Sequence, residues 1–304
     1  MLRGDNGWNY SNALTLLQFS ERNKYKLDFQ LGNEPNSFKH VFNVSISGTE
    51  LAKDFNVLRK LLNSFKSYKT SLLIGPDVTR PKHLEYSSLN YLKEFLSHTK
   101  SISAASWHQY YVNGKNTSLD DFINPKILNY LPHQINEIKK VVRSFSEDLP
   151  IWISETSSAY GGGAPGLSDR FVAAFMWLDK LGISAKLGMK VVIRQSLLDG
   201  NYALINKKFL PTPDFWISYF YKNLVGNTVL NITYGRNEEK EKVKSLRFYC
   251  HCVSPKFRKL GKIVIFGMNL SNKTEKIILI LGMKIKYPIY SFLFTPGKNN
   301  LTSK

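Results

Sequence analysis

Residues 151–165, with the sequence IWISETSSAYGGGAP, contain the pattern that decides the fold. The apolar residues 151–154 predict a short strand that ends at Glu155 and passes into a glycine-rich loop. Apolar side chains at helical spacing come before this stretch, at 127–142, and after it, at 171–178. A strand between two amphipathic helices is the repeating unit of a parallel β/α fold.

The same alternation runs through the first two thirds of the chain. It predicts strands at 27–31, 71–74, 102–107, 151–154 and 190–194, with helices at 12–22, 51–65, 86–97, 127–142 and 171–178. Each strand ends in residues that can form hydrogen bonds, among them Glu34, Asp77, His108, Glu155 and Gln195. A β/α barrel gathers its chemistry at the carboxyl ends of its strands, so these residues point to a common site.

The strand count predicts an incomplete barrel. A closed barrel of this type has eight strands, and the pattern supplies five, so three are absent or come from another chain. We therefore expect an α/β fold, a partial (β/α)8-type barrel, over residues 1–205. An open, doubly wound sheet is the alternative interpretation.

The pattern changes after residue 205. A short helix at 215–223 is followed by β-branched, alternating runs at 229–234, 246–253, 263–269, 277–281 and 289–294. These runs predict a C-terminal antiparallel β-sandwich over 206–304, cut short at its end, with residues 235–244 as a charged hairpin loop.

The amino-acid composition excludes several classes of protein and indicates the charge of a binding partner. With 304 residues, 43% hydrophobic, the chain is not a disordered tail, and its two cysteines exclude a disulfide-dense mini-domain. Neither an apolar run of about 18 residues nor a secretion signal is present as written. A net charge of +19, with 16 Lys and Arg against 5 Asp and Glu after residue 210, predicts an anionic partner.

Seven Asn-x-Ser/Thr sequons favour a glycoprotein of the secretory route, and so an acidic polysaccharide over nucleic acid as that partner. The sequons are at Asn9, Asn43, Asn116, Asn231, Asn269, Asn272 and Asn300.

Two carboxylates stand in matching positions. Glu34 and Glu155 each follow a predicted strand, and two further strand–helix units separate them. A pair of carboxylates across an opening is typical of glycoside hydrolases, in which one is the general acid and the other is the nucleophile or the base. Each taken alone could instead be a surface loop residue or an anion at a helix N-terminus.

Neighbouring residues suggest supporting roles. Asn33 can bind a sugar 2-hydroxyl, and the phenol of Tyr110 can orient Glu155 and keep it ionised. His108 is expected to be a structural hydrogen-bonding residue rather than the general base. The Cys250-His251-Cys252 cluster lacks a second ligand pair at zinc-like spacing, so we expect no metal and no cofactor.

Several longer stretches resemble heparanases, the retaining endo-β-glucuronidases that cleave heparan sulfate. They are LGNEPNSF (31–38), GPDVTRP (75–81), WHQYYVNGK (107–115), ETSSAYGGGAP (155–165), FMWLDKLG (175–182), VVIRQ (191–195) and LPTPDFW (210–216).

The resemblance implies that Glu34 is the proton donor and Glu155 the nucleophile. It implies substrate contacts from Asn33, Lys82, His108, Tyr110, Lys115, Tyr160, Gly161, Gly162, Gln195 and Tyr202. It implies no cofactor, and heparan sulfate or heparin as the partner.

The resemblance also implies a small N-terminal subunit that supplies the first barrel strands, so the chain resembles a fragment, an isoform or an incomplete gene model. Cys252 matches a family cysteine whose disulfide partner lies beyond Lys304, whereas Cys250 has no recognised counterpart. Secretion, the extracellular matrix, membrane association and the lysosome are the expected locations.

Two other functions stay open at this point. The chain could be a non-catalytic heparan-sulfate binder that resembles the inactive heparanase paralogue, although the block around Glu155 is intact here and disrupted in that relative. A nucleic-acid binder rests on charge alone.

Overall fold

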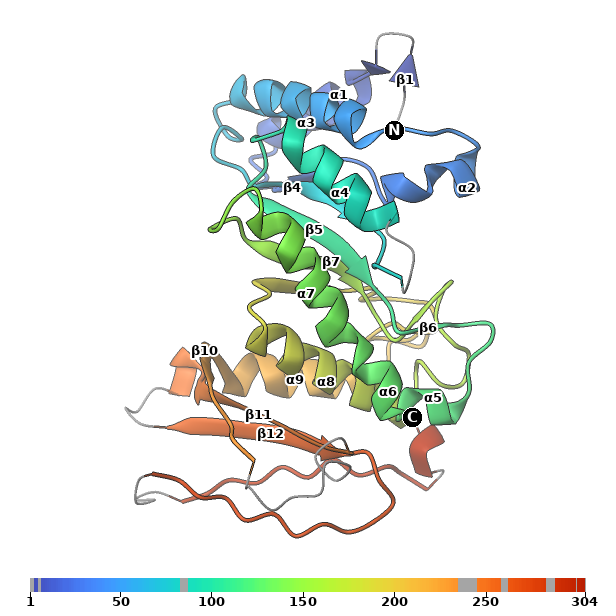
Figure 1. Cartoon of the computed structure of the whole chain (residues 1–304), viewed down its shortest axis with the longest axis vertical. Coiled ribbons are helices and arrows are strands. Elements are labelled where there is room, and N and C mark those ends of the chain that lie inside the picture. The colour runs from blue at the N-terminus through green and yellow to red at the C-terminus, as the bar shows by residue number, and fades with distance from the viewer. Residues whose placement is uncertain are drawn as a thin grey trace. The chain divides into compact units, whose positions relative to one another are not determined.

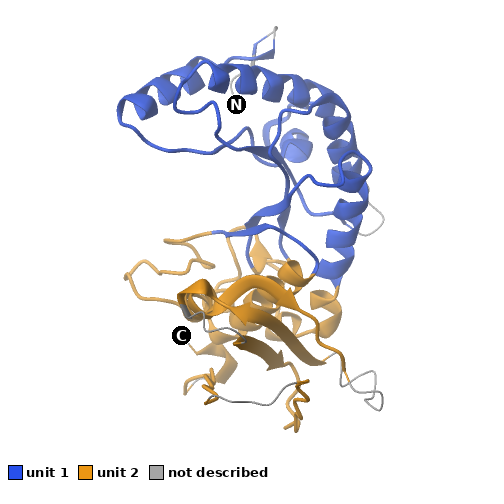
Figure 2. Cartoon of the chain, turned by 90° about the vertical axis from the view of Figure 1, so that its left-hand side faces the viewer, with its two compact units in different colours: residues 1–110, 130–157, 187–195 blue, residues 111–129, 158–186, 196–304 orange. Residues whose placement is uncertain are grey.

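The computed structural model describes residues 3–4, 7–82, 87–234, 245–257, 262–282, 288–298 and 300–303. The chain forms two compact units that are interleaved along the sequence (Figure 2). Unit 1 comprises residues 1–110, 130–157 and 187–195, and unit 2 comprises residues 111–129, 158–186 and 196–304. The expected domains, 1–205 and 206–304, stay a prediction.

Unit 1 is built on one parallel sheet with the strand order β3-β4-β5-β7-β9 (Figure 1). The strands are β3 (Phe29–Gln30), β4 (Leu73–Val78), β5 (Ala104–Gln109), β7 (Ile151–Thr156) and β9 (Val191–Arg194). Every residue of β4 and β5 is buried, as expected for parallel strands covered on both faces. The prediction of five parallel strands that make up part of a β/α barrel is therefore confirmed.

Amphipathic helices cover this sheet. They are α1 (Ser11–Arg22), α3 (Gly48–Asn63), α4 (Ser87–His98) and α7 (Tyr130–Arg143). Helix α3 begins at a capping box between Ser47 and Glu50, and its ring of Phe55 packs edge-on against Phe95 of α4 at 4.9 Å. A Cβ on Gly75 of β4 would come within 2.3 Å of the Phe55 ring, so only glycine allows this close approach.

The helix predicted at 127–142 is interrupted. The structure has α6 (Pro125–Leu128), then Asn129, and then α7. Pro132 lies in the first turn of α7 and has no N–H to donate to the carbonyl of Leu128, which disfavours one continuous helix through this position. Sequence periodicity alone does not register this missing donor.

Unit 2 contains two longer helices and short elements around them. The helices are α5 (Leu119–Phe122), α6, α8 (Phe171–Lys186) and α9 (Pro213–Leu224), and a parallel pair joins β6 (Val112–Asn113) to β8 (Ala159–Tyr160). Helix α8 packs against α9 and against β11 (Leu246–Val253). No helix in the described residues is long and apolar enough to cross a membrane.

A buried ion pair joins α8 to β11. The carboxylate of Asp179 is fully buried, and Arg247 Nη1 lies 3.1 Å from its Oδ2. Tyr249 donates to Asp179 Oδ1 at 2.6 Å, and Arg247 Nη2 donates to Asn129 Oδ1 at 2.6 Å. The buried carboxylate of Asp179 is thus paired with a cation and hydrogen-bonded, which compensates the cost of burying its charge.

The C-terminal sheet has fewer strands than predicted. It is antiparallel, with β11 between β10 (Val225–Leu230) and β12 (Ile263–Asn269), which confirms the expected antiparallel domain. The strands predicted at 277–281 and 289–294 are wrong, because neither segment pairs with another strand in the described part of the chain. The second layer of a sandwich is therefore not formed by these residues. The predicted hairpin loop at 235–244 lies outside the described residues.

Apolar alternation favoured those two strands, but a strand also needs a partner for its backbone groups. Ile280 and Leu293 are instead 92% and 86% exposed. Two rings of the second segment, Phe292 and Phe294, pack on Phe220 of α9, each at 5.1 Å.

The remaining elements are short. They are β1 (Arg3–Gly4), which pairs with β2 (Gly7–Trp8), α2 (Phe38–Phe42), and the single-turn helices Pro35–Ser37, Pro255–Phe257 and Asn300–Thr302.

Candidate active site

Glu34 lies just beyond the carboxyl end of β3, at the start of a single helical turn. Its backbone has φ 49° and ψ 54°, a left-handed conformation that is costly for a residue with a Cβ. Its N–H donates to the carbonyl of Asp77 at 3.1 Å. The side chain of Asn36 exchanges two hydrogen bonds with Thr79, at 2.7 and 3.1 Å, and so ties the turn to the end of β4.

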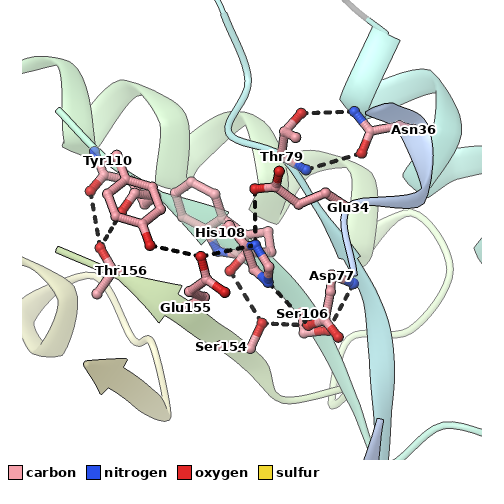
Figure 3. A network of polar contacts seen from close by, with 12 residues as sticks. Glu34, Asn36, Asp77, Thr79, Ser106, His108, Tyr110, Ser154, Glu155 and Thr156 are labelled. Atoms are coloured by element: carbon pink, nitrogen blue, oxygen red, sulfur yellow. Dashed lines mark hydrogen bonds and ion pairs between the residues drawn. The ribbon is translucent and has the colours of Figure 1, made fainter. Parts of the chain in front are cut away.

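Glu155 lies on β7, the fourth strand of the sheet order, two strands from β4. The hydroxyl of Tyr110, which follows β5, donates to Glu155 Oε1 at 2.7 Å (Figure 3). The side chain of Thr156 donates to the carbonyl of Gln109, which joins β7 to β5 beside the site. The expected contact between Tyr110 and Glu155 is thus present.

His108 lies between the two carboxylates and is only 3% exposed (Figure 3). Its Nδ1 is 3.0 Å from Glu34 Oε1 and 3.9 Å from Glu155 Oε1. Burial by itself lowers the pKa of the imidazole. The hydrogen bond to Glu34 and the charges of Glu155, Asp77 and Glu34 outweigh burial, so the pKa of His108 is raised.

The third carboxylate, Asp77, lies on the other side of the imidazole. Its Oδ1 is 3.8 Å from His108 Nε2, and the residue is 2% exposed. Ser154 and Gln30 donate to the same oxygen, at 2.5 and 3.0 Å. Burial raises the pKa of Asp77, while the hydrogen bond from Ser154, the charge of His108 and the hydrogen bond involving Ser106 oppose this shift.

Asp77 was visible in the sequence only as one of several polar residues after a strand. Its place beneath His108 depends on an irregular stretch of β4, where the pairing with β5 shifts register between Pro76 and Val78. Asp77 itself has φ 59°. A left-handed residue within a strand turns its side chain away from the direction that strict alternation predicts.

The two strand-end glutamates meet, as the sequence predicts. One carboxylate oxygen of Glu34, one of Glu155 and one ring nitrogen of His108 all lie within 4.8 Å of one another. Tyr110 and His108 each contact Oε1 of a glutamate, and within the described residues no hydrogen bond engages either Oε2. A sugar linkage between the carboxylates would therefore meet one oxygen of each.

The same spacing would admit a divalent cation. A cation there would have to displace the 3.0 Å contact between Glu34 and His108. Among the described residues, no other group of three His, Cys, Asp or Glu side chains is arranged this way.

The other predicted contact residues divide between the two units. In unit 1, Asn33 and Lys82 are exposed, and the N–H of Gln195 donates to the carbonyl of Thr156 at 2.9 Å, directly after β9. Their predicted roles in substrate binding stay predictions.

In unit 2, Lys115 is exposed and Tyr160 is 40% exposed. Gly161 and Gly162 both have positive φ, with open space where a Cβ would be. Asn201 donates to the carbonyl of Gly162 at 3.1 Å, and the next residue, Tyr202, packs beside Gly163. The glycines leave space beside the backbone of this loop, and its role in substrate binding stays a prediction.

A parallel β/α sheet that carries a pair of carboxylates at the carboxyl ends of its strands defines the class of β/α-barrel glycoside hydrolases. The N-terminal domain of glycosyl hydrolase family 79 matches residues 2–182. The chain therefore belongs to glycosyl hydrolase family 79.

Known relatives agree with this assignment. The chain is 38% identical to heparanase of Gallus gallus over 301 residues, which cover 98% of the chain and 56% of the relative. It is 33% identical to inactive heparanase-2 of Homo sapiens (99% and 52% covered) and 31% identical to hyaluronoglucuronidase of Hirudo nipponia (98% and 60%). The chain thus spans about half the length of these relatives, and its resemblance to heparanases is confirmed.

Among solved structures, CelM2, a bifunctional glucanase-xylanase from a metagenome library, has a TM-score of 0.62 at 14% identity. The match covers 86% of this chain and 58% of that one. At this identity the likeness concerns the fold.

Proposed function

We propose that the chain carries the catalytic residues of a retaining endo-β-glucuronidase that cleaves heparan sulfate by double displacement, with Glu34 as acid/base and Glu155 as nucleophile. The observation that supports this best is the pair of carboxylates within 4.8 Å of each other. Retaining enzymes hold their two carboxyl groups about 5–5.5 Å apart, whereas inverting enzymes leave about 6.5–9.5 Å for a water.

In the first step, Glu34 gives a proton from Oε2 to the glycosidic oxygen while Glu155 Oε2 attacks the anomeric carbon. The bond to the leaving sugar breaks, and a covalent glycosyl–enzyme ester forms. Tyr110 holds the other oxygen of Glu155 at 2.7 Å and so directs Oε2 toward the sugar.

In the second step, Glu34 is a carboxylate and acts as base. It takes a proton from a water whose oxygen attacks the anomeric carbon, and the ester bond to Glu155 breaks. Configuration is retained because two inversions follow each other.

Heparan sulfate is the proposed substrate because the chain is similar to heparanases and carries a net charge of +19. Lys82 and Lys115 would hold sulfate or carboxylate groups. On the resemblance alone, we assign the sugar subsites to Asn33, His108, Tyr110, Tyr160, Gly161, Gly162, Gln195 and Tyr202.

A complementing N-terminal subunit is the proposed protein partner. Strands β3 and β9 are the edges of the sheet, and each pairs on one side only within the described residues. Leu16 and Phe19 of α1 are 55% and 50% exposed, so apolar surface in unit 1 is available for a partner. Three added strands between these edges would close an eight-stranded barrel.

The second candidate is a non-catalytic protein that binds heparan sulfate. The 33% identity to inactive heparanase-2 favours it. Both functions agree with a glycoprotein that is secreted or lysosomal, or attached to the matrix or membrane through polysaccharide.

The deciding experiment incubates the full chain with a defined heparan pentasaccharide, with and without an added N-terminal subunit. Mass spectrometry identifies the products, and proton NMR at early times gives the anomeric configuration of the new reducing end. Cleavage with retained anomeric configuration is expected, and Glu155→Gln should abolish it. Glu137→Gln, which removes an exposed ion pair on α7, is the matched control and should cleave normally.

A mechanism-based 2-fluoro-glucuronide should label Glu155, as seen in the peptide map. Binding without cleavage under both conditions would support the second candidate. Cleavage of hyaluronan but not of heparan sulfate would overturn the substrate assignment, and cleavage by Glu155→Gln would overturn the nucleophile.

A further inference from the structure

The mechanism above uses two carboxylates and leaves a third, Asp77, without a role. An ionised carboxylate that is 2% exposed is costly unless its surroundings compensate the charge. Here the compensation comes from Ser154, Gln30 and the imidazole of His108, all within 3.8 Å of Oδ1. The chain thus maintains a buried anion directly behind the histidine that contacts Glu34.

The position of this anion is fixed from several directions. The backbone N–H of Asp77 donates to Ser106 Oγ at 3.1 Å, and its carbonyl accepts the N–H of Glu34. The same residue therefore holds the turn that presents the proposed acid and places a negative charge behind its imidazole neighbour.

We propose that Asp77 is a positioning residue for the glycosidase reaction: its buried carboxylate keeps His108 as an imidazolium whose Nδ1–H occupies Oε1 of Glu34. This inference rests on the proposed function. With Oε1 occupied by a donor, the proton of Glu34 is on Oε2, the oxygen that would face the glycosidic bond.

The imidazolium also acts during the reaction. Glu34 gains negative charge as it releases its proton, and a cation 3.0 Å from Oε1 stabilises that charge as it develops. A neutral His108 that carries its proton on Nε2, facing Asp77, would instead accept a hydrogen bond from Glu34 at Nδ1. That bond would draw the proton to Oε1, away from the sugar.

Among the described residues, the charges that act on His108 all have the same sign. They are Glu34 after β3, Asp77 on β4 and Glu155 on β7, and Tyr110 faces the same cluster through Glu155. Each anion favours the protonated imidazole, and together they hold the pKa of His108 above its ordinary value against burial. Activity that needs the imidazolium of His108 is present at low pH and is lost as the pH rises through the pKa of His108.

The test is Asp77→Asn in the full chain, which keeps the shape of the side chain and removes its charge. An opposite charge at this range typically moves a pKa by about 1–3 units, so the pKa of His108 should fall by about 1 unit or more. NMR titration of the imidazole of His108, assigned by the signal missing from His108→Gln, measures this shift without any need for catalysis.

The pH–rate profile for heparan cleavage supplies the second reading. The pH at which activity is lost on the basic side of the profile should fall by the same amount as the pKa of His108. At pH values above that pKa, kcat should fall about tenfold for each unit of the pKa shift, with KM little changed. Asp54→Asn is the matched control, because Asp54 is 4% exposed on α3 in the same unit and does not shift the pKa of His108. Asp54→Asn should leave both the pKa of His108 and the pH–rate profile unchanged.

Each outcome decides the proposal. An unshifted His108 in Asp77→Asn, or a shifted His108 with an unmoved basic limb, overturns the role of Asp77 and leaves the proposed function intact. If Asp77→Asn does not fold, the wild-type titration decides, since a neutral His108 at the pH of maximal activity also overturns it. A wild-type protein that shows the expected titration and cleaves no glycoside refutes the proposed function itself.

Discussion

Removing the hydroxyl of Tyr110 should slow the second chemical step more than the first. The phenol donates to Glu155 Oε1 at 2.7 Å, and this bond is strongest when Glu155 is a carboxylate. Glu155 loses its charge when it attacks the sugar and regains it when the glycosyl–enzyme is hydrolysed. The transition state of hydrolysis therefore benefits from the phenol, and Tyr110→Phe takes that benefit away.

The structure sets the size of the effect. A hydrogen bond to a charged group contributes about 1.5–3 kcal/mol. The side chain of Glu155 is 28% exposed, so water replaces part of the lost bond and the lower half of that range applies. A loss of about 1.4 kcal/mol corresponds to tenfold, so hydrolysis of the intermediate should slow by about 10- to 45-fold.

An aryl glucuronide with a good leaving group is the substrate for this assay. Tyr110→Phe should show a burst of released aryl alcohol equal to the enzyme concentration, followed by slow turnover with a lowered KM. Tyr91→Phe is the matched control, because the hydroxyl of Tyr91 donates to a backbone carbonyl in α3's cap, at 3.2 Å, away from the site. A variant without a burst and with kcat within twofold of wild type would refute the reasoning about Glu155.

Three further predictions follow from single contacts. Glu34→Gln should reduce cleavage of heparan sulfate by about 10²- to 10⁴-fold, yet spare aryl glucuronides that need no acid, and a parallel loss on both substrates would contradict its role as acid. Arg247→Met leaves the carboxylate of Asp179 buried and unpaired, so the free energy of unfolding, measured in urea, should fall by about 3–5 kcal/mol, and Arg247→Met combined with Asp179→Leu should recover most of it. Because the pKa of His108 is raised in the folded state, its contribution to stability is present below about pH 6.5, the unfolded value, and is lost as pH rises through the folded pKa. His108→Gln should flatten that part of the stability curve, and an unchanged slope would show that the imidazole is not the titrating group.

Much of the fold could be predicted from the sequence because parallel β/α units carry two independent periodic signals. Strands such as β7 begin with a short apolar run, here residues 151–153, and the helices between the strands give apolar residues at helical spacing. The C-terminal region has only the weaker signal of alternation. Segments 277–281 and 289–294 show it without a pairing partner in the described chain, and the prediction failed there.

Part of the candidate site could likewise be predicted from the sequence, and part could not. Glu34 and Glu155 could be found because each follows a recognisable strand, and strand ends meet at one edge of a parallel sheet. The position of His108 between them, and of Asp77 beneath it, depends on register shifts in β4 and β5 and on a left-handed residue within β4. Periodicity carries no information about such irregularities, so two of the four ionisable groups in the cluster had no predicted electrostatic role.

The surroundings of the two glutamates, rather than the glutamates themselves, argue for their different roles. Three carboxylates share one cluster with the imidazole of His108, and the two glutamates have different hydrogen-bond partners within it. Glu155 accepts a hydrogen bond from the phenol of Tyr110, which stabilises the ionised form that a nucleophile needs. Glu34 instead contacts His108, whose imidazolium would stabilise the negative charge that Glu34 gains when it releases its proton. A residue that must give up a proton and take one back in each cycle is better placed beside such a group, and this asymmetry favours Glu34 as the acid/base.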